Sequence, residues 1–137
     1  MRHVLIVFAL TLAFLVTDPV RADDRAAGIQ ATIKAQIEDF QRSDITAAFQ
    51  HATPSIQGKF GSPETFGRMV RQAYPMVWRP ARWEMRQIVE TDYGPVQVVL
   101  FEDQSGRLHE AGYLMEQIEG VWRIDGVRLR AVPGVGT

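Results

Sequence analysis

The spacing of the apolar residues changes at Pro80, and this change constrains the fold more than any other feature of the 137-residue sequence. Before Pro80, apolar residues recur every three or four positions, which is the spacing of amphipathic helices. After Pro80 they alternate with polar residues or form short continuous runs, as in β-strands. We therefore predict an α+β domain, in which three to four N-terminal helices pack on one face of a curved four-stranded antiparallel sheet.

Start signals support the predicted helices. Residues 25–42 carry an apolar face, and Asp44, Thr53 and Ser62 can each cap a following helix by accepting a backbone N–H hydrogen bond. Proline directly follows Thr53 and Ser62, at the helical position that tolerates it best. Gly67 lies inside the last of these helices, where glycine costs about 1 kcal/mol relative to alanine. Its presence predicts a close approach by another part of the chain.

The second half of the chain predicts four strands. They are residues 82–91, 96–102, 108–119 and 121–132. In the first strand, alternation predicts one inward-facing row, formed by Trp83, Met85, Gln87 and Val89. Ile88 is then an apolar exception on the outer side. In the last strand the apolar residues change phase at Asp125 and Gly126, which predicts a β-bulge.

The N-terminal segment is typical of a cleavable signal peptide. A basic start precedes an apolar run at residues 4–16, shorter than the about 20 residues of a membrane-spanning helix. Val20 and Ala22 provide a small-residue site for cleavage after Ala22. The expected organisation is a signal peptide (1–22), one domain (23–132) and a flexible tail (133–137). We expect a periplasmic or secreted protein with no membrane anchor after cleavage; an uncleaved anchor is the alternative.

Composition excludes several functional classes. The chain has no cysteine, which excludes disulfides and lipid attachment to a cysteine. With 15 basic and 16 acidic residues, it lacks the basic surface that nucleic-acid binding requires. There is no nucleophile elbow, zinc-binding histidine pair or phosphate-binding glycine loop, so we expect neither a metal nor a cofactor.

Three segments carry a resemblance to a known family. They are "IKAQIEDFQRSDITAAFQHATPSIQGKF", "GSPETFGRMVRQAYPMVWRP" and "GVWRIDGVRL". The chain resembles the uncharacterised family called domain of unknown function 4864, within the cone-shaped NTF2-like (cystatin-like) superfamily. The resemblance implies a cone-like fold but no catalytic residues, because this superfamily holds isomerases, dehydratases, transport factors and binding domains. About a dozen residues separate the second predicted helix from the helix of Phe66, too few for the strand pair often found there in the superfamily, which implies a shallower and more open cone.

Aromatic and amide side chains are the candidates for ligand binding. They are Tyr74, Trp78, Trp83, Met85, Gln87 and Tyr113. The aromatic residues close to Pro75 and Pro80 could form either the lid of a hydrophobic core or the wall of a ligand cavity. The Gln87 amide, on a predicted apolar face, would need a partner from the protein or from a ligand.

Three hypotheses for function remain open. The first is a non-catalytic module that binds a small apolar or amphipathic ligand, or a protein partner, in the cone. The second is a cofactor-independent lyase or isomerase that uses His51 or His109 as an acid or base, with Tyr113 as a proton donor. Each histidine also has a structural interpretation, at a helix end or a strand end, and turn chemistry explains Asp125. The third is a structural protein that forms a homodimer through the face of the sheet not covered by helices. Ile88 and the apolar residues of 96–100 would form the exposed apolar patch at this interface.

Overall fold

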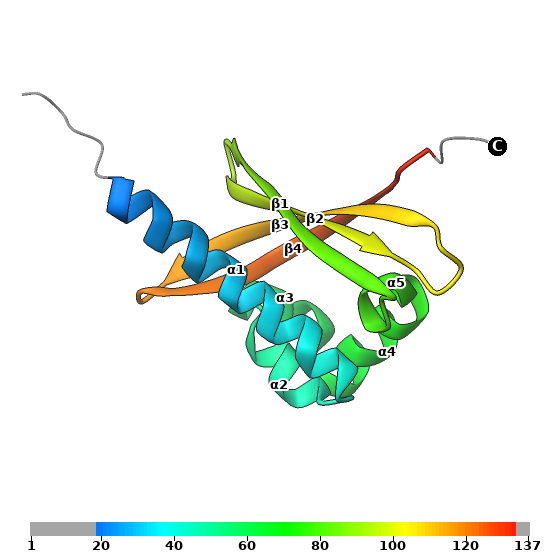
Figure 1. The fold of residues 1–137 in the computed structure, drawn as a ribbon. Coiled ribbons are helices and arrows are strands. Elements are labelled where there is room, and N and C mark those ends of the chain that lie inside the picture. Colours follow the sequence, from blue (N-terminus) through cyan, green and yellow to red (C-terminus); the bar gives the residue numbers. More distant parts are fainter. Residues whose placement is uncertain (1–18, 134–137) are drawn as a thin grey trace, which may run out of the picture.

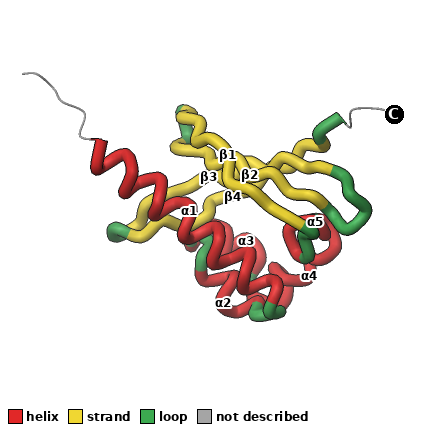
Figure 2. Tube along the Cα trace, viewed as in Figure 1, coloured by secondary structure: helices red, strands yellow, loops and turns green. Residues whose placement is uncertain are grey.

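The computed structural model describes residues 19–133. The elements are α1 (Pro19–Gln41), α2 (Ile45–Gln50), α3 (Pro54–Phe60), α4 (Pro63–Ala73), α5 (Pro75–Trp78), β1 (Arg82–Thr91), β2 (Gly94–Glu102), β3 (Leu108–Ile118) and β4 (Val121–Ala131). The helices gather on one side of the sheet, and the helical and strand halves of the chain are segregated (Figures 1 and 2). The predicted α+β class is therefore confirmed. Residues 1–18 of the predicted signal peptide and 134–137 of the predicted tail lie outside the described residues.

The predicted caps position the short helices. Asp44, Thr53 and Ser62 each accept a hydrogen bond from the backbone N–H three residues later, at 3.1, 3.3 and 3.2 Å. Each bond satisfies one of the N–H groups that the first turn of a helix leaves without a partner. Helix α1 begins at Pro19, earlier than the predicted start at residue 25. Within residues 19–133, no helix has the length and apolar character needed to cross a membrane.

Gly67 allows α2 and α4 to pack closely. A Cβ atom at this position would lie 2.7 Å from Ile45 Cγ2, well inside normal van der Waals contact. The glycine thus permits a close approach of two helices, as the sequence predicted, and the packing offsets its poor helix propensity.

The four strands form one antiparallel sheet in the order β1-β2-β3-β4. Glu119 and Gly120 connect β3 to β4 with φ angles of 50° and 80°. Two consecutive positive φ angles are typical of the tight hairpin turns that match the twist of antiparallel strands. Strand β2 begins at Gly94, two residues before the predicted start, and the other strand boundaries fall within one residue of prediction.

Strand β1 contains a β-bulge that the sequence did not predict. The pairing with β2 shifts between Met85 and Ile88, so the face on which each side chain lies changes at this point. Ile88 packs against the core, whereas Gln87 is exposed and Val89 is 43% exposed. The predicted inward positions of Gln87 and Val89 and the outward position of Ile88 are therefore wrong. Ile88 cannot belong to an outer dimerisation patch, and dimerisation stays a prediction that rests on the β2 residues.

The buried amide on this sheet is Gln97 in β2. Its side chain is fully buried, and Nε2 donates to the carbonyl oxygens of Arg86 at 2.8 Å and Gln87 at 3.3 Å. Its Oε1 accepts a hydrogen bond of 3.2 Å from Gln30 in α1. Gln97 therefore satisfies carbonyl groups at the β1 bulge, where the regular ladder of hydrogen bonds is interrupted.

Strand β4 contains the predicted bulge. Ile124 pairs with Met115 and Gly126 with Leu114, so Asp125 is the extra residue. Ile124 belongs to the buried core, and Val127 on the other side of the bulge packs against the same core. The bulge therefore keeps the apolar residues of β4 on the helix-facing side of the sheet despite their change of phase.

The core lies between α1 and the sheet. Ile29, Ile33, Ile37 and Phe40 of α1 are at most 1% exposed. Trp78 packs on Phe40 with a ring centroid separation of 5.7 Å, which adds the short helix α5 to this core. The apolar spacing of α1 thus corresponds to one continuous buried face.

Candidate ligand-binding cavity

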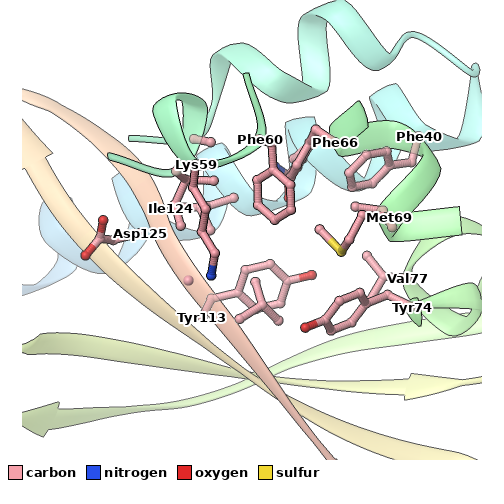
Figure 3. Close-up of a pocket in the computed structure, with 16 residues that line it drawn as sticks. Phe40, Lys59, Phe60, Phe66, Met69, Tyr74, Val77, Tyr113, Ile124 and Asp125 are labelled. Atoms are coloured by element: carbon pink, nitrogen blue, oxygen red, sulfur yellow. The ribbon is translucent and has the colours of Figure 1, made fainter. Parts of the chain in front are cut away.

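A cavity of about 220 Å³ lies between the helices and the sheet, next to the core. Its walls come from α3, α4 and α5 on one side and from β3 and β4 on the other (Figure 3). Most of the wall is apolar: it includes Phe40, Phe60, Phe66, Met69, Val70 and Val77. An apolar cavity with few polar groups is the usual form of a small-molecule site.

Local sequence rules explain the helical wall. The Ser62 cap starts α4, and its apolar face carries Phe66, Met69 and Val70, which lie at helical spacing on one side. Proline cannot continue a helix, and α4 ends at Ala73, just before Tyr74 and Pro75. Tyr74 therefore lies at the junction of α4 and α5 and contributes to the cavity wall.

A short strap between α2 and α3 ties the helices to the bulge of β4. The Ile124 N–H donates to His51 O at 2.8 Å, and the Thr53 N–H donates to Ile124 O at 2.9 Å. Thr53 Oγ1 also donates to Asp125 Oδ1 at 2.7 Å. Ile124, Asp125 and Val127 all line the cavity, so these hydrogen bonds position one edge of the site.

Tyr113 contributes the most unusual polar group of the cavity. The residue is 0% exposed, and among residues 19–133 no group forms a hydrogen bond with its Oη. Burial raises the pKa of this phenol above its ordinary value, so the hydroxyl keeps its proton and can act as a donor. A buried hydroxyl without a partner costs about 1–3 kcal/mol. Its Oη points toward Met69 and Tyr74 and away from Asp125 (Figure 3).

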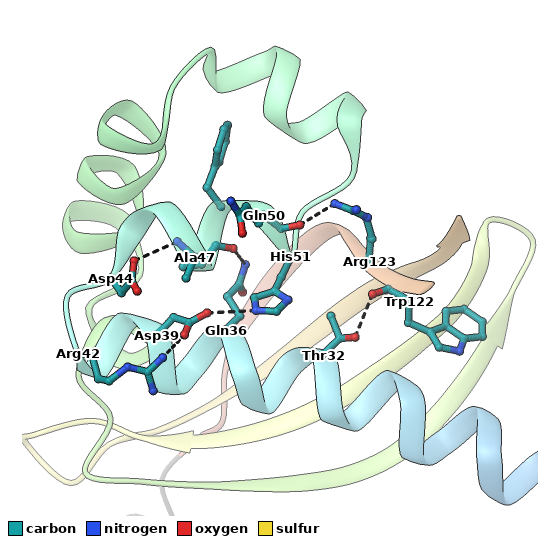
Figure 4. Close-up of polar contacts among 12 residues, drawn as sticks. Thr32, Gln36, Asp39, Arg42, Asp44, Ala47, Gln50, His51, Trp122 and Arg123 are labelled. Carbon is teal, nitrogen blue, oxygen red and sulfur yellow. Dashed lines mark hydrogen bonds and ion pairs between the residues drawn. The ribbon is translucent and has the colours of Figure 1, made fainter. Parts of the chain in front are cut away.

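Charged groups lie at another part of the cavity. Lys59 is an exposed residue of α3 whose side chain extends toward the cavity, and Asp125 comes from the β4 bulge (Figure 3). Gln36 lines the cavity from α1, but its Nε2 already donates to Ala48 O at 3.1 Å (Figure 4). The charges are therefore separated from the buried Tyr113 hydroxyl.

The structure brings together only part of the predicted site. Tyr74 and Tyr113 line the cavity, whereas Trp78, Trp83, Met85 and Gln87 are not among its lining residues. Trp78 packs on the core beside the guanidinium group of Arg79, 4.7 Å from the ring centroid. Trp83 and Met85 pack against the core from β1, and Gln87 is exposed.

Sequence reasoning did not identify the helical side of the site. The residues it missed include Lys59, Phe60, Phe66 and Met69. The available signal was the apolar face of α4, which the sequence indicated as a buried stripe. The sequence of α4 alone does not show whether its apolar face fills a core or borders a cavity, because that depends on which residues the fold places opposite this face.

Both candidate catalytic histidines are hydrogen bonded outside the cavity. His51 Nε2 lies 3.1 Å from Asp39 Oδ2, and Asp39 also pairs with Arg42, in a network that joins α2 to α1 (Figure 4). His109 Nε2 lies 2.8 Å from Asp103 Oδ2 at the end of the β2–β3 turn. The hydrogen bond from His109, followed by one from a neighbouring serine, holds the pKa of Asp103 well below its ordinary value.

No metal centre is evident in the part of the chain that the structure describes. Residues 19–133 contain no group of three or more histidine, aspartate or glutamate side chains arranged to hold a metal ion. The cavity lining itself provides two phenolic side chains, Tyr74 and Tyr113, a mainly apolar surface and the charged side chains of Lys59 and Asp125.

The fold is an α+β domain in which helices and a curved antiparallel sheet border a small, partly open and mainly apolar cavity, with the buried Tyr113 hydroxyl beside it. The chain belongs to the family described as Domain of unknown function (DUF4864), whose model matches residues 22–137. Neither a curated protein nor a solved structure matches the chain. The arrangement of helices and sheet fits the NTF2-like superfamily implied by the sequence resemblance.

Proposed function

We propose that this protein is a non-catalytic module that binds a small, mainly apolar molecule in the cavity. The observation that carries this proposal is the Tyr113 hydroxyl, which is completely buried at the cavity and has no hydrogen-bond partner among residues 19–133. Buried polar groups in folded proteins almost always have partners. A bound molecule with an acceptor atom would provide one, once the side chains that cover Oη, with Met69 and Tyr74 beside it, move aside to admit that atom.

The size of the cavity supports a compact ligand. An apolar protein cavity of about 150 Å³ is large enough for benzene, and pockets for drug-sized molecules begin at roughly 300 Å³. The cavity here, at about 220 Å³, lies between these values. A molecule with one ring and a short substituent matches this volume.

The positions of the histidines favour binding over catalysis. A general acid or base must reach the reacting atoms of a bound substrate. His51 and His109 are both engaged with aspartates outside the cavity, and Tyr113 has a raised pKa that suits it for donating a hydrogen bond. The titratable side chains that do line the cavity, Lys59 and Asp125, lie apart from the Tyr113 hydroxyl, and Asp125 already accepts a hydrogen bond from Thr53.

We also propose that the protein acts after export, following cleavage after Ala22. The apolar segment and small-residue site of the N-terminus support this proposal. Among the α1 residues whose side chains the structure describes (22 and 24–41), the buried ones begin at Ile29, so cleavage after Ala22 would retain all of these core residues.

The binding proposal can be tested with α-methylstyrene, a ring with one short apolar substituent, by following backbone amide shifts in NMR titrations. We expect saturable shifts around the cavity in the wild-type protein. Met69→Trp should abolish them, because the larger side chain fills part of the cavity. Arg68→Trp provides a matched control on the exposed side of α4 and should bind like wild type.

Native mass spectrometry of the protein from its own host provides a second measurement. We expect a bound small molecule on the wild type that is absent from Met69→Trp. The binding proposal is wrong if neither the titration nor the mass spectrum shows a molecule bound in the wild-type cavity, or if Met69→Trp binds as wild type does.

A further inference from the structure

Within the proposed binding function, on which this inference rests, the cavity also indicates which chemical class of ligand it takes. We propose that the ligand is uncharged and carries a carbonyl oxygen that accepts a hydrogen bond from Tyr113 Oη, with its apolar part against the aromatic side chains of α3 and α4. Three features of the cavity point to this class: the Tyr113 donor, the apolar surroundings of its hydroxyl and the position of the charged groups.

Tyr113 determines that the ligand group is an acceptor. Burial raises the pKa of the phenol, so Oη stays protonated and can donate a hydrogen bond to a lone pair of an acceptor atom. Tyr74 turns its hydroxyl toward the same region of the cavity (Figure 3). A carbonyl oxygen has two lone pairs and can accept from two hydroxyl groups at once.

The surroundings of Oη determine that the acceptor is neutral. Met69, Val77 and the aromatic residues of the wall cannot stabilise a negative charge, and transfer of an unpaired carboxylate into such surroundings is far more costly than transfer of a carbonyl group. Lys59 could neutralise an anion, but Oη points away from it (Figure 3). An anionic ligand that placed its charge near Lys59 would therefore leave the Tyr113 hydroxyl without a hydrogen-bond partner.

Two probes of nearly identical shape can separate the acceptor from the apolar contacts. Acetophenone carries a C=O group where α-methylstyrene carries C=CH₂, so both fill the cavity alike and only the first can accept a hydrogen bond. The comparison of wild type with Tyr113→Phe cancels the different solubilities of the two probes in water.

We expect Tyr113→Phe to weaken acetophenone binding about five- to tenfold, which corresponds to the loss of one hydrogen bond, and to change α-methylstyrene binding less than twofold. The infrared C=O stretch of bound acetophenone should lie at lower frequency in the wild type than in Tyr113→Phe. Benzoate should bind the wild type more weakly than acetophenone.

Failure of this inference can be distinguished from failure of the proposed function. If α-methylstyrene binds but Tyr113→Phe affects both probes equally or neither, the cavity binds apolar molecules and the carbonyl inference is wrong. Tighter binding of benzoate than of acetophenone would overturn the uncharged class. If neither probe binds the wild type, the proposed function itself fails. Tyr113→Phe removes only an unpartnered hydroxyl, so thermal unfolding should show a variant at least as stable as wild type.

Discussion

Replacement of Gly67 by alanine has two opposite effects on the stability of the protein, and the approximate size of each is known. In an isolated helix, Gly→Ala stabilises by about 1 kcal/mol. Here the new Cβ would lie 2.7 Å from Ile45 Cγ2 and 3.1 Å from Ile45 Cβ. Rotation of the Ile45 side chain could move Cγ2 but not Cβ, which is fixed to the backbone of α2. Relief of the overlap therefore requires the two helices to separate, and overpacking of this kind costs about 1–3 kcal/mol.

We expect Gly67→Ala to lower the free energy of unfolding by up to about 2 kcal/mol, because the overpacking cost of about 1–3 kcal/mol at Ile45 is only partly offset by about 1 kcal/mol of helix propensity. For a domain of this size the melting temperature should fall by up to roughly 10 °C. Urea unfolding followed by tryptophan fluorescence measures the change. Gly58→Ala in α3 is the matched control: a Cβ there has no neighbour within 4 Å, so this variant should gain stability.

A double-mutant cycle tests the proposed cause. In an Ile45→Gly background the obstructing atoms of residue 45, Cβ included, are absent, and Gly67→Ala should then stabilise the protein by about 1 kcal/mol. The change of sign between the two backgrounds is the specific result expected from the helix contact. If Gly67→Ala stabilises the wild type, or has the same sign in both backgrounds, the close packing of α2 on α4 is not what this glycine provides.

Three further outcomes can be measured. Gln97→Leu should lower the free energy of unfolding by about 2–4 kcal/mol in urea titrations, because it removes the side-chain donor to the carbonyl groups of Arg86 and Gln87 at the β1 bulge and to the buried carbonyl group of Val98. Gln30→Ala should cost less than about 1 kcal/mol. Asp103 has a lowered pKa, so its contribution to stability is present above the ordinary aspartate value of about 4 and is lost as the pH falls below it. In His109→Ala, NMR titration should show the Asp103 pKa shifted upward toward that value. N-terminal sequencing of the exported protein should begin immediately after Ala22, and a longer N-terminus would refute the proposed cleavage site.

Features that depend on neighbouring residues could be predicted from the sequence. The caps at Asp44, Thr53 and Ser62 act on a backbone group three residues away, so the sequence itself contains both partners. The bulge at Asp125 was predictable for a similar reason: the apolar residues on either side of it change phase within one strand. Such a change has few explanations other than an extra residue.

Features that depend on distant residues could not be predicted in this way. The bulge of β1 involves Arg86 and Gln87, two polar residues with no turn signal, and their carbonyl groups are satisfied by Gln97 on another strand. The sequence showed Gln97 only as one polar residue within a nearly continuous apolar strand. The cavity is a comparable case, since Tyr113 and the apolar face of α4 meet only in the folded protein.

The conformation of the chain around Tyr113 explains how a hydroxyl comes to be buried without a partner. Tyr113 pairs with Val127, one step beyond the β4 bulge, and its ring extends from the sheet toward Tyr74, which lies between α4 and α5 (Figure 3). Phenylalanine at this position would fill the same volume without the cost of burying an unpaired hydroxyl. The hydroxyl therefore lowers the stability of the domain taken alone, and a bound acceptor would turn the same group into a favourable contact. For this reason Tyr113, rather than the tryptophans of the proline-rich segment, is the residue on which a ligand-binding role is best tested.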